Sequence, residues 1–192
     1  GCVASMDKVN GKLTVWGTFQ APHVVRTVAS LLSGIEEHNI RVVSPDIGGG
    51  FGNKVGVYPG YVCAIVASIV TGKPVKWIED RRENLLSMNQ ARECQAEIEI
   101  ACERDGTILA FRGHCDYDLG AYPRTNGLVA PRNVPQFVSG PYRVSHIDIA
   151  CRIVFTNKTG SGTFRAPGRF ESNFFSERLV DMAAADLGLD PA

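Results

Sequence analysis

A glycine-dense loop, Gly48-Gly49-Gly50-Phe51-Gly52-Asn53-Lys54, separates a strand-like run at residues 40–44 from a helix-like run at residues 59–71. Three consecutive glycines cost much conformational entropy, so a chain keeps them where φ must be positive or where the backbone must approach something closely. A strand that leads through glycines into a helix N-terminus also directs free backbone N–H groups at one point, which suits an anion. The spacing alone leaves two alternatives open, a ligand cradle and a tight turn between buried elements.

Apolar periodicity and turn residues predict an α+β (mixed α/β) fold, with β-hairpins and a mixed sheet packed against three main helices. Two hairpins are indicated by Asn10-Gly11 and Asp105-Gly106, because each dipeptide lies between apolar-rich runs. The predicted strands are 2–6, 13–19, 38–44, 75–78, 96–103, 107–115 and 147–155, and the main helices are 22–33, 59–71 and 170–187.

Several finer expectations follow from the same patterns. The helix at 59–71 is apolar all round, which predicts burial on every side. The final helix should bury one face, made of Phe175, Leu179, Met182 and Ala183. Residues 79–84 are predicted to form a solvated helical turn, and residues 117–142 an irregular segment with one helical turn. Two acidic residues at a strand end, Asp116 and Asp118, are expected to be solvated.

Composition limits the possible partners. The chain has 192 residues, with 20 basic and 20 acidic side chains, so it can bury a sizeable core and has no basic field for nucleic acid or an anionic membrane. Six scattered cysteines without a C-x-x-C pair indicate buried free thiols in a reducing compartment. The most apolar run, residues 61–70, is too short to span a bilayer. We therefore expect a cytoplasmic protein without membrane or nucleic-acid partners.

A second glycine-bearing loop, residues 160–169, also leads from a predicted strand into a helix. It contains Arg165 and Arg169, whose planar guanidinium groups suit bidentate contacts to an anion. We expect a functional role for Arg165, which lies inside the loop, and an exposed helix-start position for Arg169. The first loop is neither a Walker A nor a G-x-G-x-x-G motif, and the sequence contains no G-x-S-x-G nucleophile.

Three motifs occur in order: Thr18-Phe19-Gln20-Ala21-Pro22-His23, Asp46-Ile47 followed by the first glycine loop, and Thr163-Phe164-Arg165-Ala166-Pro167-Gly168-Arg169. Together they resemble the molybdenum-binding subunit of the xanthine dehydrogenase, aldehyde oxidase and aerobic carbon monoxide dehydrogenase family. The resemblance covers nearly the whole chain. With a sequence that opens on Gly1 and stops soon after the last predicted helix, it implies that residues 1–192 are a partial molybdopterin-binding domain of a larger subunit.

The resemblance implies cofactor contacts in all three motifs. Gln20 matches the glutamine that hydrogen-bonds an oxygen ligand of molybdenum. The Gly50-Phe51-Gly52 backbone matches the loop that approaches the molybdenum and the pterin dithiolene, and Arg165 with Ala166 matches the second cofactor-holding loop. In this family a molybdopterin, commonly the cytosine dinucleotide in bacteria, holds the metal, so the protein supplies hydrogen bonds and no directly ligating side chains.

The family's reaction is the oxidative hydroxylation of an electron-poor carbon, with water as the oxygen source. Electrons then leave through iron-sulfur centres to a flavin or another acceptor. The resemblance therefore implies a small-molecule substrate, partner subunits or domains that carry iron-sulfur centres and FAD, and an oligomeric full-length enzyme. The family's glutamate base belongs to a motif late in the full subunit, so we expect no catalytic residue among residues 1–192 and no activity of this chain alone.

Departures from the family pattern limit the substrate. Ala166 stands where carbon monoxide dehydrogenases have a copper-binding cysteine, which argues against a copper-molybdenum centre although residues 48–77 are close to that branch. Two predicted substrate-pocket positions, Val55 and Pro167, replace a glutamate and a phenylalanine of purine hydroxylases. A further purine-binding arginine of the family falls near Ala91 or Arg92. These departures disfavour purines and leave an aldehyde or an N-heterocycle.

Three other interpretations remain open. The two glycine loops at helix starts also fit a non-catalytic nucleotide- or phosphate-binding module. The likeness of residues 48–77 to one branch fits a carbon monoxide dehydrogenase-like large subunit that lacks the copper cysteine. The chain is also compatible with a structural or subunit-interface segment.

Overall fold

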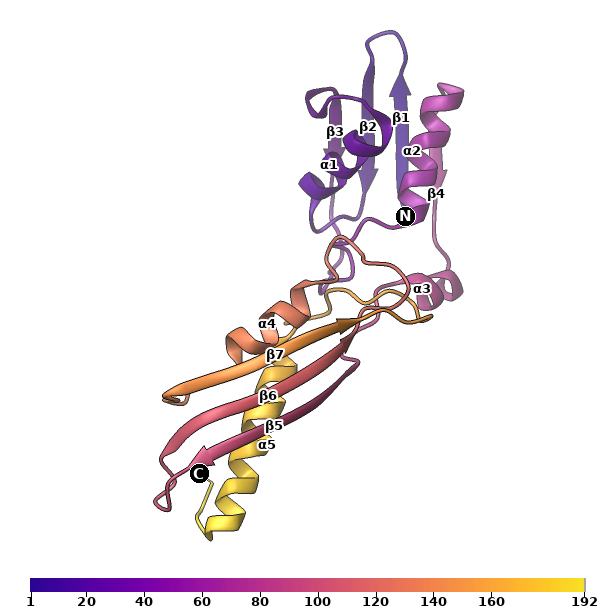
Figure 1. Cartoon of the computed structure of the whole chain (residues 1–192). Helices are drawn as coiled ribbons and strands as arrows, with labels where there is room; N and C mark the ends of the chain where they lie inside the picture. Colours follow the sequence, from indigo (N-terminus) through magenta and orange to yellow (C-terminus); the bar gives the residue numbers. More distant parts are fainter. Residues whose placement is uncertain (192) are drawn as a thin grey trace. The chain divides into compact units, whose positions relative to one another are not determined.

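The computed structural model describes residues 1–191 as an α+β protein made of two compact units (Figure 1). The first unit comprises Gly1–Asn89 and Arg124–Asn126, and the second contains the other described residues. Each unit has its own sheet and its own helices, so the predicted fold class is confirmed.

The first unit is built on a four-stranded sheet. Its strands are β1 (Cys2–Asp7), β2 (Lys12–Gly17), β3 (Ile40–Val43) and β4 (Val75–Trp77), in the order β3-β2-β1-β4. Because β1 pairs antiparallel with β2 and β4 while β2 pairs parallel with β3, the sheet is mixed as predicted. The first hairpin is confirmed, and Gly11 at its turn has a φ of 65°.

Two helices, α1 (Pro22–Ser33) and α2 (Pro59–Thr71), pack on one face of this sheet (Figure 1). Alternate strand residues face them, as shown by Leu13 and Val15, which are completely buried. Each helix has proline in its first turn and is followed by a glycine in the left-handed region, which explains why both predicted spans are confirmed.

The prediction that α2 is buried on every side is wrong. Val66 and Val70 are 44% and 71% exposed, because only the face that carries Ala64 and Ile65 lies against the sheet. Short elements complete the unit: a 3₁₀ turn, η1 (Glu37–Asn39), precedes β3, and helix α3 (Arg81–Ser87) extends the predicted helical turn. The Asp80 and Glu83 side chains form a capping box that begins α3.

The second unit contains a three-stranded sheet. Its strands are β5 (Cys94–Cys102), β6 (Ile108–Asp118) and β7 (His146–Val154), with β5 antiparallel and β7 parallel to the central β6. Helices α4 (Val129–Phe137) and α5 (Arg169–Leu187) pack against the sheet. Phe111, Val138 and Leu179 form the centre of the core between them. The second hairpin is thus confirmed, and the irregular segment proves to contain a nine-residue helix.

Two expectations in the second unit hold only in part. Of the predicted buried face of α5, Leu179 is buried and Phe175 and Ala183 are half-buried, but Met182 is 49% exposed, because the buried face runs through Ser172 and Ser176 to Leu179. Asp118 is not solvated: its side chain is 11% exposed, and it accepts hydrogen bonds from the Gly120 amide and the Thr156 hydroxyl. Asp116 is paired with Arg152 at 2.6 Å.

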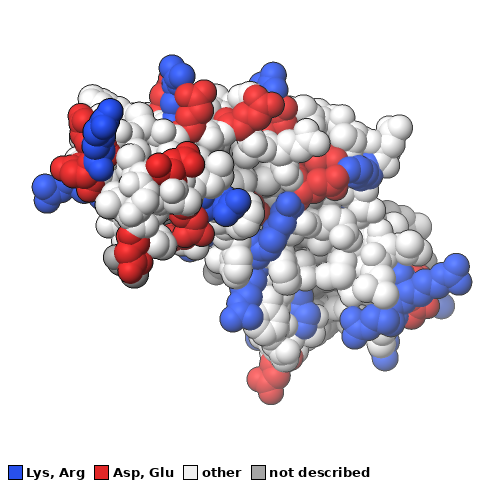
Figure 2. Space-filling model, turned by 90° about the horizontal axis from the view of Figure 1, so that it is seen from below, with Lys and Arg blue, Asp and Glu red and all other residues white. Residues whose placement is uncertain are grey.

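The six cysteines are free thiols, but the expectation that they are buried holds only in part, since Cys63 on α2 is exposed. No helix among residues 1–191 has the combined length and apolar character needed to cross a membrane. The same residues contain no cluster of three or more histidine, cysteine or acidic side chains suited to a metal ion. Basic and acidic side chains both occur on the face seen in Figure 2.

Candidate functional site

The first glycine loop connects β3 to α2 and has an unusual backbone. Gly48, Gly49 and Gly52 have φ values of 64°, 92° and 94°, which glycine adopts without strain. Phe51 has a φ of 51°, which is uncommon for a residue with a side chain, and the residue is 62% exposed. Strained residues persist only where the surrounding structure enforces them, and they are concentrated at functional sites.

Gln20 holds this loop in place. Its Oε1 accepts hydrogen bonds from the Gly52 amide at 2.8 Å and from the Lys54 amide at 3.3 Å. Its own backbone amide donates to the Lys54 carbonyl at 2.9 Å. Because the oxygen is directed at the loop, the side-chain NH₂ group is the part of Gln20 that remains available to a ligand.

Gly50 is glycine for a different reason from its neighbours. Its φ is not in the left-handed region, but a Cβ at this position would overlap the amide group of Gln20. Glycine is therefore needed at position 50 because its backbone lies close to the Gln20 side chain, and at positions 48, 49 and 52 because φ is positive there. The two purposes predicted for the glycine run are both present within five residues.

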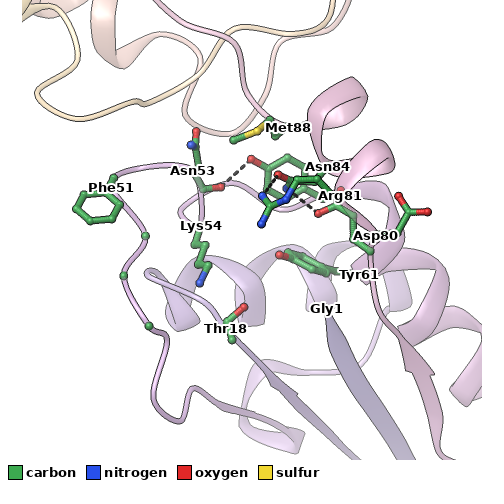
Figure 3. Close-up of a pocket in the computed structure, with 15 residues that line it drawn as sticks. Gly1, Thr18, Phe51, Asn53, Lys54, Tyr61, Asp80, Arg81, Asn84 and Met88 are labelled. Atoms are coloured by element: carbon green, nitrogen blue, oxygen red, sulfur yellow. Dashed lines mark hydrogen bonds between the residues drawn. The ribbon is translucent and has the colours of Figure 1, made fainter.

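A cavity of about 600 Å³ lies beside the loop, entirely within the first unit. Figure 3 shows the side chains of Lys54, Tyr61 and Arg81 facing this space. The Lys54 ammonium donates to the Ile47 carbonyl at 2.5 Å. The complete lining is Gly1, Thr18, Gly48, Gly49, Gly50, Phe51, Asn53, Lys54, Tyr58, Tyr61, Glu79, Asp80, Arg81, Asn84 and Met88.

The charges of this cavity are balanced. Two cations, Lys54 and Arg81, are offset by Glu79 and Asp80, so the cavity does not by itself select an anion. Burial raises the pKa of the Tyr61 phenol, which keeps it neutral and able to donate a hydrogen bond. Val55, a predicted substrate-pocket residue, is half-buried and does not belong to the lining.

The second glycine-bearing loop lies in the second unit, between β7 and α5. Arg165 is exposed, and the next residue, Ala166, has a φ of 55°. Asn133 of α4 donates from its side chain to the Pro167 carbonyl at 3.0 Å. Gly168 has a φ of 76°, and a Cβ there would overlap the Ala130 carbonyl, so the loop is closely fitted against α4.

The expectation that Arg169 occupies an exposed helix-start position is confirmed, since it is the exposed first residue of α5, and its guanidinium lies 4.5 Å from the centre of the Phe137 ring. The structure also shows a residue that sequence patterns did not assign to this loop. Arg92, which precedes β5, donates to the carbonyl oxygens of Phe164 and Arg165. The only signal for it was a family arginine expected near Ala91 or Arg92, and that signal pointed to a substrate contact.

Comparison with known proteins identifies the family of this chain. The chain matches the molybdopterin cofactor-binding domain along residues 1–192. It belongs to this family. Its relatives include the carbon monoxide dehydrogenase large chain of Afipia carboxidovorans, with 50% identity over the whole chain, and subunit gamma of the 6-hydroxypseudooxynicotine dehydrogenase complex of Paenarthrobacter nicotinovorans, with 40% identity over 97% of the chain.

Solved structures agree with this membership. Quinoline 2-oxidoreductase from Pseudomonas putida 86 matches 99% of the chain with a TM-score of 0.93 and 35% identity. The chain spans 24% of that protein, 24% of the Afipia relative and 23% of the Paenarthrobacter relative. Both glycine-bearing loops that the sequence singled out lie within the matched residues 1–192, the first loop in the first unit and the second loop in the second unit.

Proposed function

We propose that the chain binds the molybdenum cofactor within the large subunit of a molybdenum hydroxylase. The observation that carries this proposal is the position of Gln20, whose oxygen holds the Gly52 amide and whose NH₂ group remains to donate. A glycine loop that only connected β3 to α2 would not require the strained backbone of Phe51 or the close approach at Gly50.

The residues present fit a pterin-held metal. The first loop offers the side-chain amide of Gln20 and exposed backbone at Gly48 and Gly49. Gln20, Gly50, Phe51 and Gly52 would hold the cofactor in the first unit. When bound, molybdopterin supplies the redox chemistry, and these residues orient it by hydrogen bonds and by close backbone approach.

Arg165 and Ala166 are proposed to hold the cofactor on evidence from their own unit. Arg165 is exposed, so its guanidinium is free to reach a ligand, and Ala166 presents left-handed backbone that is held by neighbouring residues. Planar guanidinium groups recognise oxyanions with two parallel hydrogen bonds, which fits the phosphate of a pterin nucleotide. We propose the cytosine dinucleotide form of the pterin.

An aldehyde or an N-heterocycle is the proposed substrate class, hydroxylated with oxygen from water. Quinoline 2-oxidoreductase and the Paenarthrobacter nicotine 6-hydroxylase large subunit, which is 34% identical, support the heterocycle by their names. The 50% identity to a carbon monoxide dehydrogenase favours a second candidate, a large subunit of that branch. Ala166 opposes it, because an alanine cannot hold copper as a cysteine thiolate does.

The proposed partners are the other subunits of such an enzyme, which would carry the iron-sulfur centres and FAD. The names of relatives as a large chain and as a subunit of a complex support this part of the proposal. We further propose that residues 1–192 are a partial molybdopterin-binding domain of a larger subunit, with the catalytic glutamate in another part of that subunit.

The test is expression of the full-length subunit with its partner subunits, followed by measurement of molybdenum, copper and released pterin and cytidine nucleotide. We expect about one molybdenum and one pterin per subunit, no stoichiometric copper, and dye reduction with an aldehyde or N-heterocycle. A folded complex that lacks both molybdenum and pterin refutes the proposal, and one that binds nucleotide alone favours the nucleotide-binding module. Stoichiometric copper with carbon monoxide oxidation favours the second candidate.

A further inference from the structure

We propose that Arg92 is a positioning residue that holds the Phe164–Ala166 backbone in its cofactor-binding conformation. This inference rests on the function proposed above for Arg165 and Ala166. It concerns only residues of the second unit.

Arg92 contacts the loop through two successive carbonyl groups. Its Nη2 atom donates to the Phe164 carbonyl at 3.2 Å and to the Arg165 carbonyl at 2.6 Å. These are the two peptide groups that lead into Ala166, whose φ is 55°. A charged donor that binds both carbonyls fixes the direction of this backbone and stabilises the left-handed residue that follows.

The guanidinium of Arg92 is itself held on several sides. It lies 4.1 Å from the centre of the Phe170 ring and 5.2 Å from the centre of the Phe164 ring. Its Nη1 atom is 3.3 Å from Oε2 of Glu171, a side chain that is only 5% exposed. Because the two rings and the buried carboxylate already restrict the Arg92 side chain, it loses little conformational entropy when it binds the carbonyls. Its hydrogen bonds can therefore hold the loop backbone in one conformation.

Glu171 strengthens this assignment. Its other oxygen, Oε1, is buried without a hydrogen-bond partner in the described chain, so Arg92 provides the compensating charge for this carboxylate. A buried carboxylate without a cation is strongly unfavourable. Arg92 also has a φ of 69°, so it joins Phe51 and Ala166 as a described non-glycine residue in the left-handed region.

Arginine and lysine are not equivalent at this position. A lysine preserves the positive charge opposite Glu171, but it has no planar group to stack on Phe170 and no fork to bind carbonyl and carboxylate together. Arg92→Lys therefore separates positioning of the loop from simple charge compensation.

The experiment compares the wild type, Arg92→Lys, Phe170→Leu and a matched control, Arg112→Lys, in the full-length subunit with its partners. Arg112 belongs to the same unit and forms an ion pair with Glu99, but both side chains are about 70% exposed and lie on β6 and β5. The readouts are amide hydrogen exchange of the loop and the molybdenum and pterin content. Exchange at Arg169, whose amide donates to the Ala166 carbonyl, reports the loop directly.

We expect Arg92→Lys to speed exchange at this amide about tenfold, the effect of losing one charge-assisted hydrogen bond. Molybdenum content should fall with it, while exchange in β5, β6 and β7 stays at the wild-type rate. Phe170→Leu should give a smaller effect in the same direction, and Arg112→Lys should give none.

The inference is overturned if Arg92→Lys and Arg112→Lys show the same exchange rates in the loop and the same molybdenum content. It is also overturned if Arg92→Lys increases exchange uniformly throughout the sheet. If Arg92→Lys does not fold, Phe170→Leu decides: faster loop exchange with lower molybdenum supports the inference, and no change overturns it. A wild type without molybdenum or pterin refutes the proposed function. In that case the exchange rates of the loop in Arg92→Lys and Arg112→Lys still test whether Arg92 holds the loop.

Discussion

Substitution of Gly50 by alanine should disturb the first loop through one specific neighbour. The three atoms closest to an added Cβ all belong to the Gln20 side chain, and the backbone of Gly50 is outside the left-handed region. The alanine is therefore unfavourable because it displaces Gln20. Displacement breaks the hydrogen bonds from the Gly52 and Lys54 amides to Oε1.

The magnitude follows from these two bonds. Each contributes about 1 kcal/mol, so Gly50→Ala and Gln20→Ala should each destabilise the loop by about 2 kcal/mol, or roughly 30-fold in its opening equilibrium. Combined, the two substitutions should cost about the same as Gln20→Ala alone. Once the side chain is truncated, the added methyl group has lost the neighbour that it would overlap.

The assay is hydrogen exchange at the Gly52 and Lys54 amides in the full-length subunit, measured for both single variants and the double variant. Gly48→Ala is the matched control. Its Cβ would have nothing within 4 Å, but its φ of 64° makes alanine unfavourable by about 1 kcal/mol with or without Gln20. If Gly50→Ala costs as much in the Gln20→Ala background as in the wild type, the close approach is not the reason for this glycine.

Three further outcomes are expected. Gly168→Ala should lower loop stability by about 2 kcal/mol and reduce molybdenum content, because it combines a positive φ with overlap on the Ala130 carbonyl; denaturant unfolding and metal analysis of the full-length subunit check this. The hydrogen bond from Arg152 lowers the pKa of Asp116 from 3.8, so the stability from this pair is present above that pH and is lost as the pH falls below it. The wild type and Arg152→Gln should then differ in stability at about pH 6 and converge near about pH 2 in acid titrations. Burial, with a nearby acidic group, raises the pKa of Cys94 to about 11, so iodoacetamide at about pH 8 should leave this thiol unmodified in mass spectra of the native protein.

Elements with local signals were predictable from the sequence. Asn10-Gly11 sets the first hairpin through a positive φ at the glycine, and proline and glycine mark the two ends of α1 and α2. The burial of α2 was not predictable in the same way. Hydrophobic periodicity shows which residues can be buried, but exposure at Val66 depends on what other elements cover the helix.

The candidate site shows the same division. The sequence singled out both loops and, through family resemblance, predicted Gln20 and Arg165 as cofactor-binding residues. It did not reveal that Gln20 directs its oxygen at an amide 32 positions along the chain, or that Arg92 binds carbonyls 72 and 73 positions away. Contacts at such separations depend on tertiary structure, and a single arginine before a strand has no local pattern that marks it.

Each of the two loops has to stabilise a strained backbone, and the two loops do so with different residues. Each contains a non-glycine residue in the left-handed region, Phe51 in one and Ala166 in the other, which is unfavourable unless the surroundings enforce it. In the first loop a neutral amide oxygen accepts from backbone N–H groups, and in the second a charged arginine donates to backbone carbonyls. Peptide groups fixed through their N–H leave carbonyls available, and those fixed through their carbonyls leave N–H groups available. Binding of the Arg165 carbonyl by Arg92 therefore leaves the N–H of the same peptide group, at Ala166, on the side that can donate to an anion.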